Sequence, residues 1–339
     1  MSSASTQTSL DVELQPGKPP TLLLDSLDAF PGGASGWASA HRDAVRAAVT
    51  NHGSLLIRGL GLHSTDDVAA AFRSLAGTLM EEEREAFAVR TSFGGGVLSS
   101  TPWPANQQMC SHHELSYTLS FPQTMMFACL SEPTSGGATG VVDAPSILEA
   151  LPADLVARFE RQGWMLVRNY NEDIGASIAD SFGTDDRAAV ERYCASQGIT
   201  CEWQPDGGLR TSQVRSAIVT HPHTGQRCWF NQIAFLSEWT IDPEVREFLV
   251  DMYGADGLPF TTRFGDGEPI GADVIDLLNA TYEERTARVS WRAGDLLLVD
   301  NVRTAHSREA YEGSREILVG LADPIDLAEC APTVEVSSR

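Results

Sequence analysis

The chain has 339 residues, 42% of them hydrophobic, which is enough for a substantial buried core. Its 24 basic and 46 acidic residues give a formal net charge of -22, and this argues against nucleic acids and anionic membranes as partners, because both attract clustered positive charge. No apolar run reaches the roughly 18 to 20 residues of a membrane span, and the N-terminus has no signal-peptide pattern, so we expect a cytoplasmic protein.

The expected organisation is a flexible tail followed by one domain. Residues 1–18 are rich in Ser, Thr, Gln and Pro and have little apolar content, which indicates a tail. No linker composition appears after residue 20, so residues 19–339 are predicted to form a single domain. The six cysteines include no Cys-x-x-Cys pair and are expected to be thiols rather than zinc ligands or disulfides.

Apolar spacing predicts helices and short strands that do not alternate regularly. In chain order we expect a helix over 37–49, a strand over 54–58, a helix over 67–75, turn-linked strands over 125–142, a helix over 146–162, a strand over 164–167, a helix over 188–195, strands over 217–219 and 228–231, helices over 243–253 and 272–279, and strands over 295–299 and 317–321. Such scattered strands, with no Gly-x-Gly-x-x-Gly motif, favour a mainly β sandwich or barrel with flanking helices over a doubly wound sheet.

Two imidazoles and a carboxylate are concentrated in the segment 109–117. In extended backbone, residues two apart project to the same side, so His112 and Glu114 can converge on one metal while His113 points away. His306, at the polar end of an apolar strand, is the candidate third ligand. Two histidines and one carboxylate on one face of an octahedron leave three positions open, an arrangement associated with iron(II) oxygenases.

Two arginines follow His306, one before and one after a predicted turn. The Glu312-Gly313 pair suggests a hairpin that returns a second strand alongside the first, which would bring Arg315 near His306. A guanidinium offers a rigid, two-pronged donor for a carboxylate. Arg308 is the alternative for this role.

The order of these motifs resembles the taurine dioxygenase and clavaminate synthase-like family of iron and 2-oxoglutarate oxygenases, over about residues 55–323. The matching residues are the His112-x-Glu114 motif, the Gly-Gly-Ala-Thr turn that ends at Thr139, His306 and Arg315. The resemblance implies a double-stranded β-helix, or jelly roll, with a lid-like segment inserted at about 171–287.

For the site, the family resemblance implies a metal centre and a neighbouring carboxylate site. His112, Glu114 and His306 would hold Fe(II), while Thr139 and Arg315 would hold the distal carboxylate of 2-oxoglutarate. O2 would be the second cosubstrate.

A narrower resemblance points to the branch that contains the syringomycin-pathway aspartyl hydroxylase. It is carried by the runs 96–104, 112–117, 221–225 and 229–232. This likeness implies hydroxylation of an amino-acid or peptidyl-type small molecule, free or tethered to a carrier protein, in natural-product biosynthesis. Candidate substrate contacts are His113, Arg210, His221 and Asn231.

Other functions can be built on the same residues. Desaturation or epoxidation would use the same scaffold and cofactors. A zinc hydrolase would use metal-bound water as nucleophile, but Thr139 and Arg315 would then have no shared purpose. A non-catalytic jelly-roll binding protein would leave the histidines incidental.

Overall fold

Two facing β-sheets form the centre of the protein. The computed structural model describes residues 10–81, 84–170 and 175–336. The larger sheet has the order β1 (Thr21–Leu23), β2 (Ser54–Arg58), β15 (Leu296–Asp300), β6 (Ser120–Ser131), β18 (Glu316–Asp326), β4 (Val97–Ser99) and β3 (Ser92–Gly94). The smaller sheet consists of β5 (Met109–His112), β16 (Thr304–Arg308) and β8 (Thr139–Asp143), and β7 (Ser135–Gly136) pairs with β17 (Tyr311–Glu312). Phe127 and Val319 of the larger sheet share one core cluster with Val141 of the smaller sheet.

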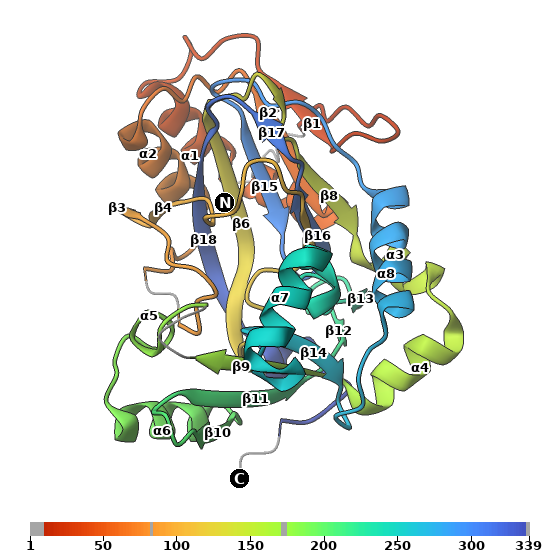
Figure 1. Cartoon of the computed structure of the whole chain (residues 1–339). Coiled ribbons are helices and arrows are strands. Elements are labelled where there is room, and N and C mark those ends of the chain that lie inside the picture. The colour runs from red at the N-terminus through yellow and green to blue at the C-terminus, as the bar shows by residue number, and fades with distance from the viewer. Residues whose placement is uncertain (1–9, 82–83, 171–174, 337–339) are drawn as a thin grey trace, which may run out of the picture.

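Helices α1 (Gly33–His52) and α2 (Thr65–Leu75) lie together against the outer face of the larger sheet (Figure 1). Both faces of strand β2 are buried, one against these helices and the other against the smaller sheet. Leu55 and Ile57 pack in the cluster with these helices, whereas Leu56 packs between the sheets, as the two-residue period of a strand requires. Ser64 caps α2 by accepting a hydrogen bond from the Asp67 amide.

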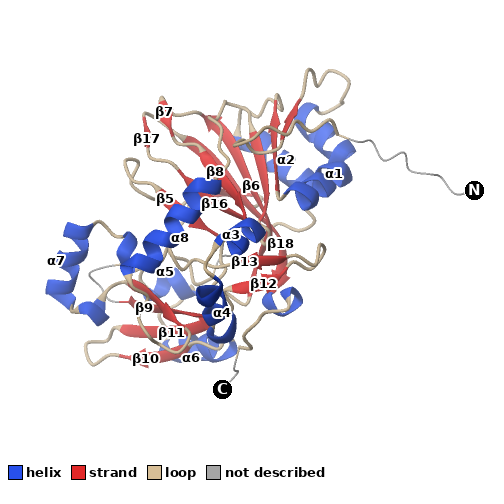
Figure 2. Cartoon of the chain, turned by 90° about the vertical axis from the view of Figure 1, so that its right-hand side faces the viewer, coloured by secondary structure: helices blue, strands red, loops and turns tan. Residues whose placement is uncertain are grey.

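A further, four-stranded antiparallel sheet stands apart from the sandwich (Figure 2). Its strands, in order, are β10 (Thr200–Trp203), β11 (Leu209–Arg215), β9 (Trp164–Tyr170) and β14 (Phe260–Phe264). The remaining elements are the hairpin β12 (Ile218–Thr220) and β13 (Arg227–Trp229), helices α3 (Ala144–Ala150), α4 (Ala153–Gln162), α5 (Ile178–Phe182), α6 (Arg187–Ser196), α7 (Pro243–Tyr253) and α8 (Ala272–Arg285), and the 3-10 turns Glu238–Thr240, Ala255–Gly257 and Leu327–Cys330. Within the described residues no helix is long and apolar enough to cross a membrane.

Several expectations about organisation can be compared with these elements. The helix predicted over 146–162 is two helices, α3 and α4, because Pro152 disfavours a helical conformation at Leu151, which is extended. The four-stranded sheet overlaps the expected insertion of about 171–287 but begins earlier, at β9. Residues 171–174 lie outside the described part. Of the expected tail, residues 10–18 contact the fold: Leu10 packs on the core of α1 and α2, and residues 1–9 are not described.

A buried glutamate connects the loop before β3 to the four-stranded sheet through hydrogen bonds. The side chain of Glu85, a residue only 2% exposed, accepts hydrogen bonds from Tyr193 Oη at 3.0 Å and Gln213 Nε2 at 2.8 Å. The Glu85 backbone carbonyl accepts from Tyr117 Oη at 3.0 Å and Arg168 Nη1 at 2.8 Å. Burial raises the pKa of Glu85. This single residue therefore joins four elements of the chain.

Replacing Glu85 with alanine should lower the free energy of unfolding by about 2–5 kcal/mol, because the part-buried Tyr193 hydroxyl and one N–H of the buried Gln213 amide would lose their acceptor. The other N–H of that amide keeps the Tyr117 carbonyl. Glu85→Gln keeps one acceptor oxygen and removes the buried ionisable group, so a smaller loss is expected. Urea unfolding of the three proteins measures the difference. Equal stability of the alanine variant and the unmodified protein would contradict this view of the network.

Candidate active site

Two histidines face each other across a pair of neighbouring strands. His112 ends β5, and His306 lies opposite it on β16, where the two residues are register partners. Side chains of paired residues project from the same face of a sheet, and the two ring centroids are 4.4 Å apart. Glu114 follows in the turn after β5, and one ligand atom from each of the three residues lies within 4.8 Å of the others. The predicted His-x-Glu and distal histidine therefore converge.

The protonation of these groups suits a divalent metal. Nδ1 of His112 donates to the Cys110 carbonyl at 2.8 Å, which leaves the lone pair on Nε2. Burial lowers the pKa of His112 and lowers that of His306 well below the usual value for imidazole, so both rings are neutral near pH 7. Neutral imidazoles and a carboxylate form the donor set of a mononuclear iron(II) site, so the residues present fit that metal.

The main chain of Glu114 is held from the opposite sheet. Its amide donates to Asn301 Oδ1 at 2.7 Å, and Asn301 Nδ2 donates back to the Glu114 carbonyl at 2.9 Å. On the other side, the ring of Phe235 stacks on His112 with centroids 4.4 Å apart and an interplanar angle of 15°. Sequence reasoning missed both residues. For Asn301, the polar Asp-Asn pair at the end of an apolar strand was the available signal.

The predicted carboxylate-binding pair lies in the same small cavity as the three metal ligands. This cavity, of about 40 Å³, is lined by Thr139 and Arg315 as well as by His112, Glu114 and His306. Arg315 Nε donates to a backbone carbonyl, that of Gly137, at 3.0 Å, and its Nη2 lies 3.4 Å from Thr139 Oγ1. Burial lowers the pKa of Arg315 to about 10, which leaves it charged at neutral pH.

A match to a family model covers most of the chain. Residues 30–321 match the taurine catabolism dioxygenase TauD, TfdA family. The chain belongs to this family. It is therefore an Fe(II)- and 2-oxoglutarate-dependent dioxygenase, with ferrous iron as its metal and 2-oxoglutarate and O2 as its cosubstrates.

Two relatives and one solved structure illustrate the likeness within the TauD and TfdA family. The dapdiamide synthesis protein DdaC of Enterobacter agglomerans is 31% identical over 280 residues, which cover 82% of this chain and 84% of that protein. A clavaminate synthase-like protein of Arabidopsis thaliana is 29% identical over 283 residues, covering 79% and 81% of the two chains.

The crystal structure of a taurine dioxygenase from Burkholderia xenovorans superposes with a TM-score of 0.51 at 15% identity, covering 94% of this chain and 92% of that one. The superposition concerns the fold alone, and it confirms the predicted jelly roll.

The two arginines after His306 have different surroundings in this TauD-family site. Arg308 also lines the cavity, but its guanidinium donates to the backbone carbonyls of Trp103, Pro104 and Gln107 at 3.3, 2.6 and 2.6 Å. Arg308 thus fastens a loop, whereas Arg315 is placed beside a threonine hydroxyl. This geometry favours Arg315 for the 2-oxoglutarate carboxylate.

The predicted hairpin between these arginines is wrong. Strand β16 pairs with β5 and β8 in the smaller sheet, whereas β18 pairs with β6 and β4 in the larger one. The chain therefore crosses from the smaller to the larger sheet in the segment around Gly313, between β16 and β18. Arg315 consequently reaches the site from the larger sheet, at the start of β18.

The histidines proposed as substrate contacts are bonded within the protein. His113 Nδ1 donates to the Asn301 carbonyl at 2.6 Å, and burial lowers its pKa to about 4. His221 Nε2 lies 2.9 Å from Asp300 Oδ2, and both residues are buried.

The other two proposed contacts also have protein partners. Asn231 Nδ2 donates to the Ala217 carbonyl at 3.2 Å, and Arg210 lies 3.6 Å from Asp256 on the surface. Within the described part of the chain, none of the four proposed substrate contacts lines the cavity at the three metal ligands.

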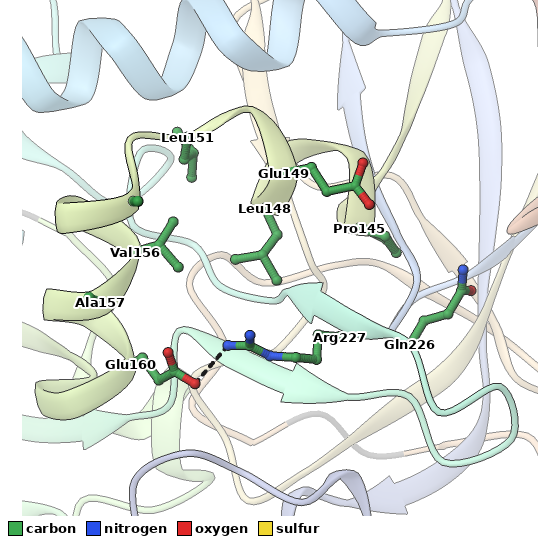
Figure 3. A pocket seen from close by; sticks show the side chains of 10 residues that line it. Pro145, Leu148, Glu149, Leu151, Val156, Ala157, Glu160, Gln226 and Arg227 are labelled. Atoms are coloured by element: carbon green, nitrogen blue, oxygen red, sulfur yellow. Dashed lines mark hydrogen bonds and ion pairs between the residues drawn. The ribbon is translucent and has the colours of Figure 1, made fainter.

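A surface pocket larger than the cavity at the metal ligands lies between α3, α4 and β13 (Figure 3). It has a volume of about 490 Å³ and contains the ion pair Glu160–Arg227 at 2.7 Å. These side chains are 43% and 50% exposed, so water screens their charges. The chemistry of a TauD-family enzyme therefore belongs to the smaller, buried cavity.

Proposed function

We propose that this dioxygenase hydroxylates an amino-acid or peptidyl-type small molecule in natural-product biosynthesis. The observation that carries the proposal is the shared cavity, in which Arg315 and Thr139 lie beside His112, Glu114 and His306. The similarity to a dapdiamide synthesis protein supports the natural-product context.

The proposed roles follow from the contacts of each side chain. His112, Glu114 and His306 hold the iron and leave three positions open. Arg315 and Thr139 hold the distal carboxylate of 2-oxoglutarate. When bound, iron and 2-oxoglutarate use O2 to oxidise a C–H bond of the substrate.

The rest of the cavity excludes bulk water. Phe127, Ile317 and Val319 line it from the larger sheet, and all three are buried. A cavity of about 40 Å³ is far smaller than the roughly 300–1,000 Å³ of usual small-molecule sites, so we expect side chains of the wall to move when cosubstrate and substrate bind.

The test is a panel of free amino acids and small peptides, supplied with iron(II), 2-oxoglutarate and O2. Free molecules come first because the net charge of -22 disfavours docking of an acidic carrier protein. We expect substrate-dependent succinate release and a product that has gained one oxygen atom. A product that has lost two hydrogens would instead identify a desaturase, and an epoxide an epoxidase. No turnover of any compound in the panel would contradict the proposed class of substrate.

Glu114 separates hydroxylation from halogenation. Its carboxylate is expected to fill the coordination position that a halide would otherwise take, so product mass spectrometry in high chloride or bromide should detect no halogenated compound. Glu114→Gly opens that position without building a halide pocket, and we expect activity to be lost rather than redirected. A halogenated main product from the unmodified enzyme would overturn the ligand role of Glu114.

A further inference from the structure

A third arginine, Arg90, lies beside the proposed metal ligands. Its side chain is 5% exposed and lines the same cavity. Nη2 of Arg90 is 3.0 Å from Oε2 of Glu114, and this same oxygen lies 3.7 Å from Nε2 of His306. The guanidinium therefore contacts the carboxylate oxygen that faces another ligand of the triad.

Thr101 fixes the position of this guanidinium. Nε and Nη2 of Arg90 donate to Thr101 Oγ1 at 3.1 and 2.9 Å. Because a guanidinium is charged at neutral pH, a positive charge is held against Glu114. The charge of Arg90 also contributes to lowering the pKa of both His112 and His306.

This contact has a defined effect on a metal held by Glu114. A carboxylate oxygen that accepts a charge-assisted hydrogen bond has less electron density to donate to a metal. A fixed positive charge also repels a bound cation, and it repels a trivalent ion more strongly than a divalent one. Both effects weaken metal binding and disfavour oxidation of the metal.

We propose that Arg90 is a positioning residue that holds Glu114 as a weak ligand and thereby favours ferrous over ferric iron. The benefit for this enzyme class is that the resting metal stays in the state that the reaction uses, and the cost is a lower metal affinity. The inference depends on the three ligands and is independent of which substrate is oxidised.

The test replaces Arg90 and measures the metal itself, without substrate. Arg90→Gln removes the charge and keeps an amide donor. Because a positive charge next to the cation is removed, we expect Arg90→Gln to bind Mn(II) roughly tenfold more tightly. This direction is opposite to the roughly 10–100-fold loss of affinity that usually follows removal of a residue that hydrogen-bonds a metal ligand. The midpoint potential of bound iron should shift to a lower value. Arg90→Lys keeps the charge and should stay close to the unmodified protein in both measurements.

Two further variants test whether the effect comes from the total charge of the cavity or from the placement of Arg90. Arg308→Gln removes another buried charge from the same cavity, but Arg308 contacts backbone carbonyls, so its effect should be clearly smaller. Thr101→Val loosens Arg90 without removing it and should shift affinity and potential in the same direction as Arg90→Gln, by less. Thermal melting of the Mn(II)-loaded proteins checks that each variant is folded.

Three results would overturn the proposal. The first is unchanged or weaker Mn(II) binding by folded Arg90→Gln. The second is an equal response of Arg308→Gln, which would assign the effect to the total charge of the cavity. The third is an unchanged affinity and potential in Thr101→Val, which decides the matter even if Arg90→Gln does not fold. Failure to find an oxidised product would test the proposed function and would leave these measurements unaffected.

Discussion

Replacing His306 or His112 with alanine is expected to abolish succinate release and to weaken Mn(II) binding by more than about 100-fold, since even residues that only contact a ligand change affinity by about 10–100-fold. Each variant removes one of three protein donors whose ligand atoms lie within 4.8 Å of one another. The remaining two donors cannot hold the metal against water. Metal titration and a succinate assay measure the two effects separately.

A matched control is available for the histidine variants. His223 is exposed and does not line the cavity, so His223→Ala should leave both metal binding and turnover unchanged. Full turnover by His306→Ala or by His112→Ala would remove that residue from the metal site.

The second large effect is expected at the cosubstrate. Arg315→Gln should raise the KM for 2-oxoglutarate roughly tenfold to a hundredfold, because one charged hydrogen bond of about 1.5–3 kcal/mol is lost. The KM for the substrate should change little, because the lost contact is to one ligand only. Initial rates at varied concentrations of each compound give the two values.

Arg308→Gln is the control for this prediction. Its guanidinium donates to three backbone carbonyls, so the variant should lose stability while its KM for 2-oxoglutarate stays near that of the unmodified enzyme. If the two arginine variants showed the reverse pattern, the carboxylate site would move to Arg308.

The metal ligands could be predicted because their signals are local. His112 and Glu114 are two residues apart, and the two-residue period of extended chain is enough to place them together. His306 follows the apolar strand β15 in the sequence, which drew attention to it, although it lies within the separate strand β16 rather than at the end of β15. The mainly β class followed from short apolar runs, all of which correspond to strands of the structure.

Other features depend on contacts between distant segments and leave little trace in the sequence. Arg90 and Asn301 lie in loops, and only the folded chain brings each of them to Glu114. The Asp-Asn pair marks Asn301 as unusual but does not name its partner. The sheet change after β16 was missed for the same reason, since a turn signal at Glu312-Gly313 does not say which sheet the next strand joins. The break at Pro152, by contrast, was readable and was overlooked.

The pairing of His112 with His306 across β5 and β16 determines which segments of the protein can vary without disturbing the metal site. The two rings lie on adjacent, paired strands of the smaller sheet, and neither strand belongs to the four-stranded sheet of β9, β10, β11 and β14. Segments carried by that sheet, such as β10 or the loop before β14, can therefore diverge in length and sequence while the donor geometry stays constant. Exchanging them between related enzymes is a practical route to new substrates, because a chimaera of this kind keeps the two histidines on the strand ladder and keeps Glu114 bonded to Asn301.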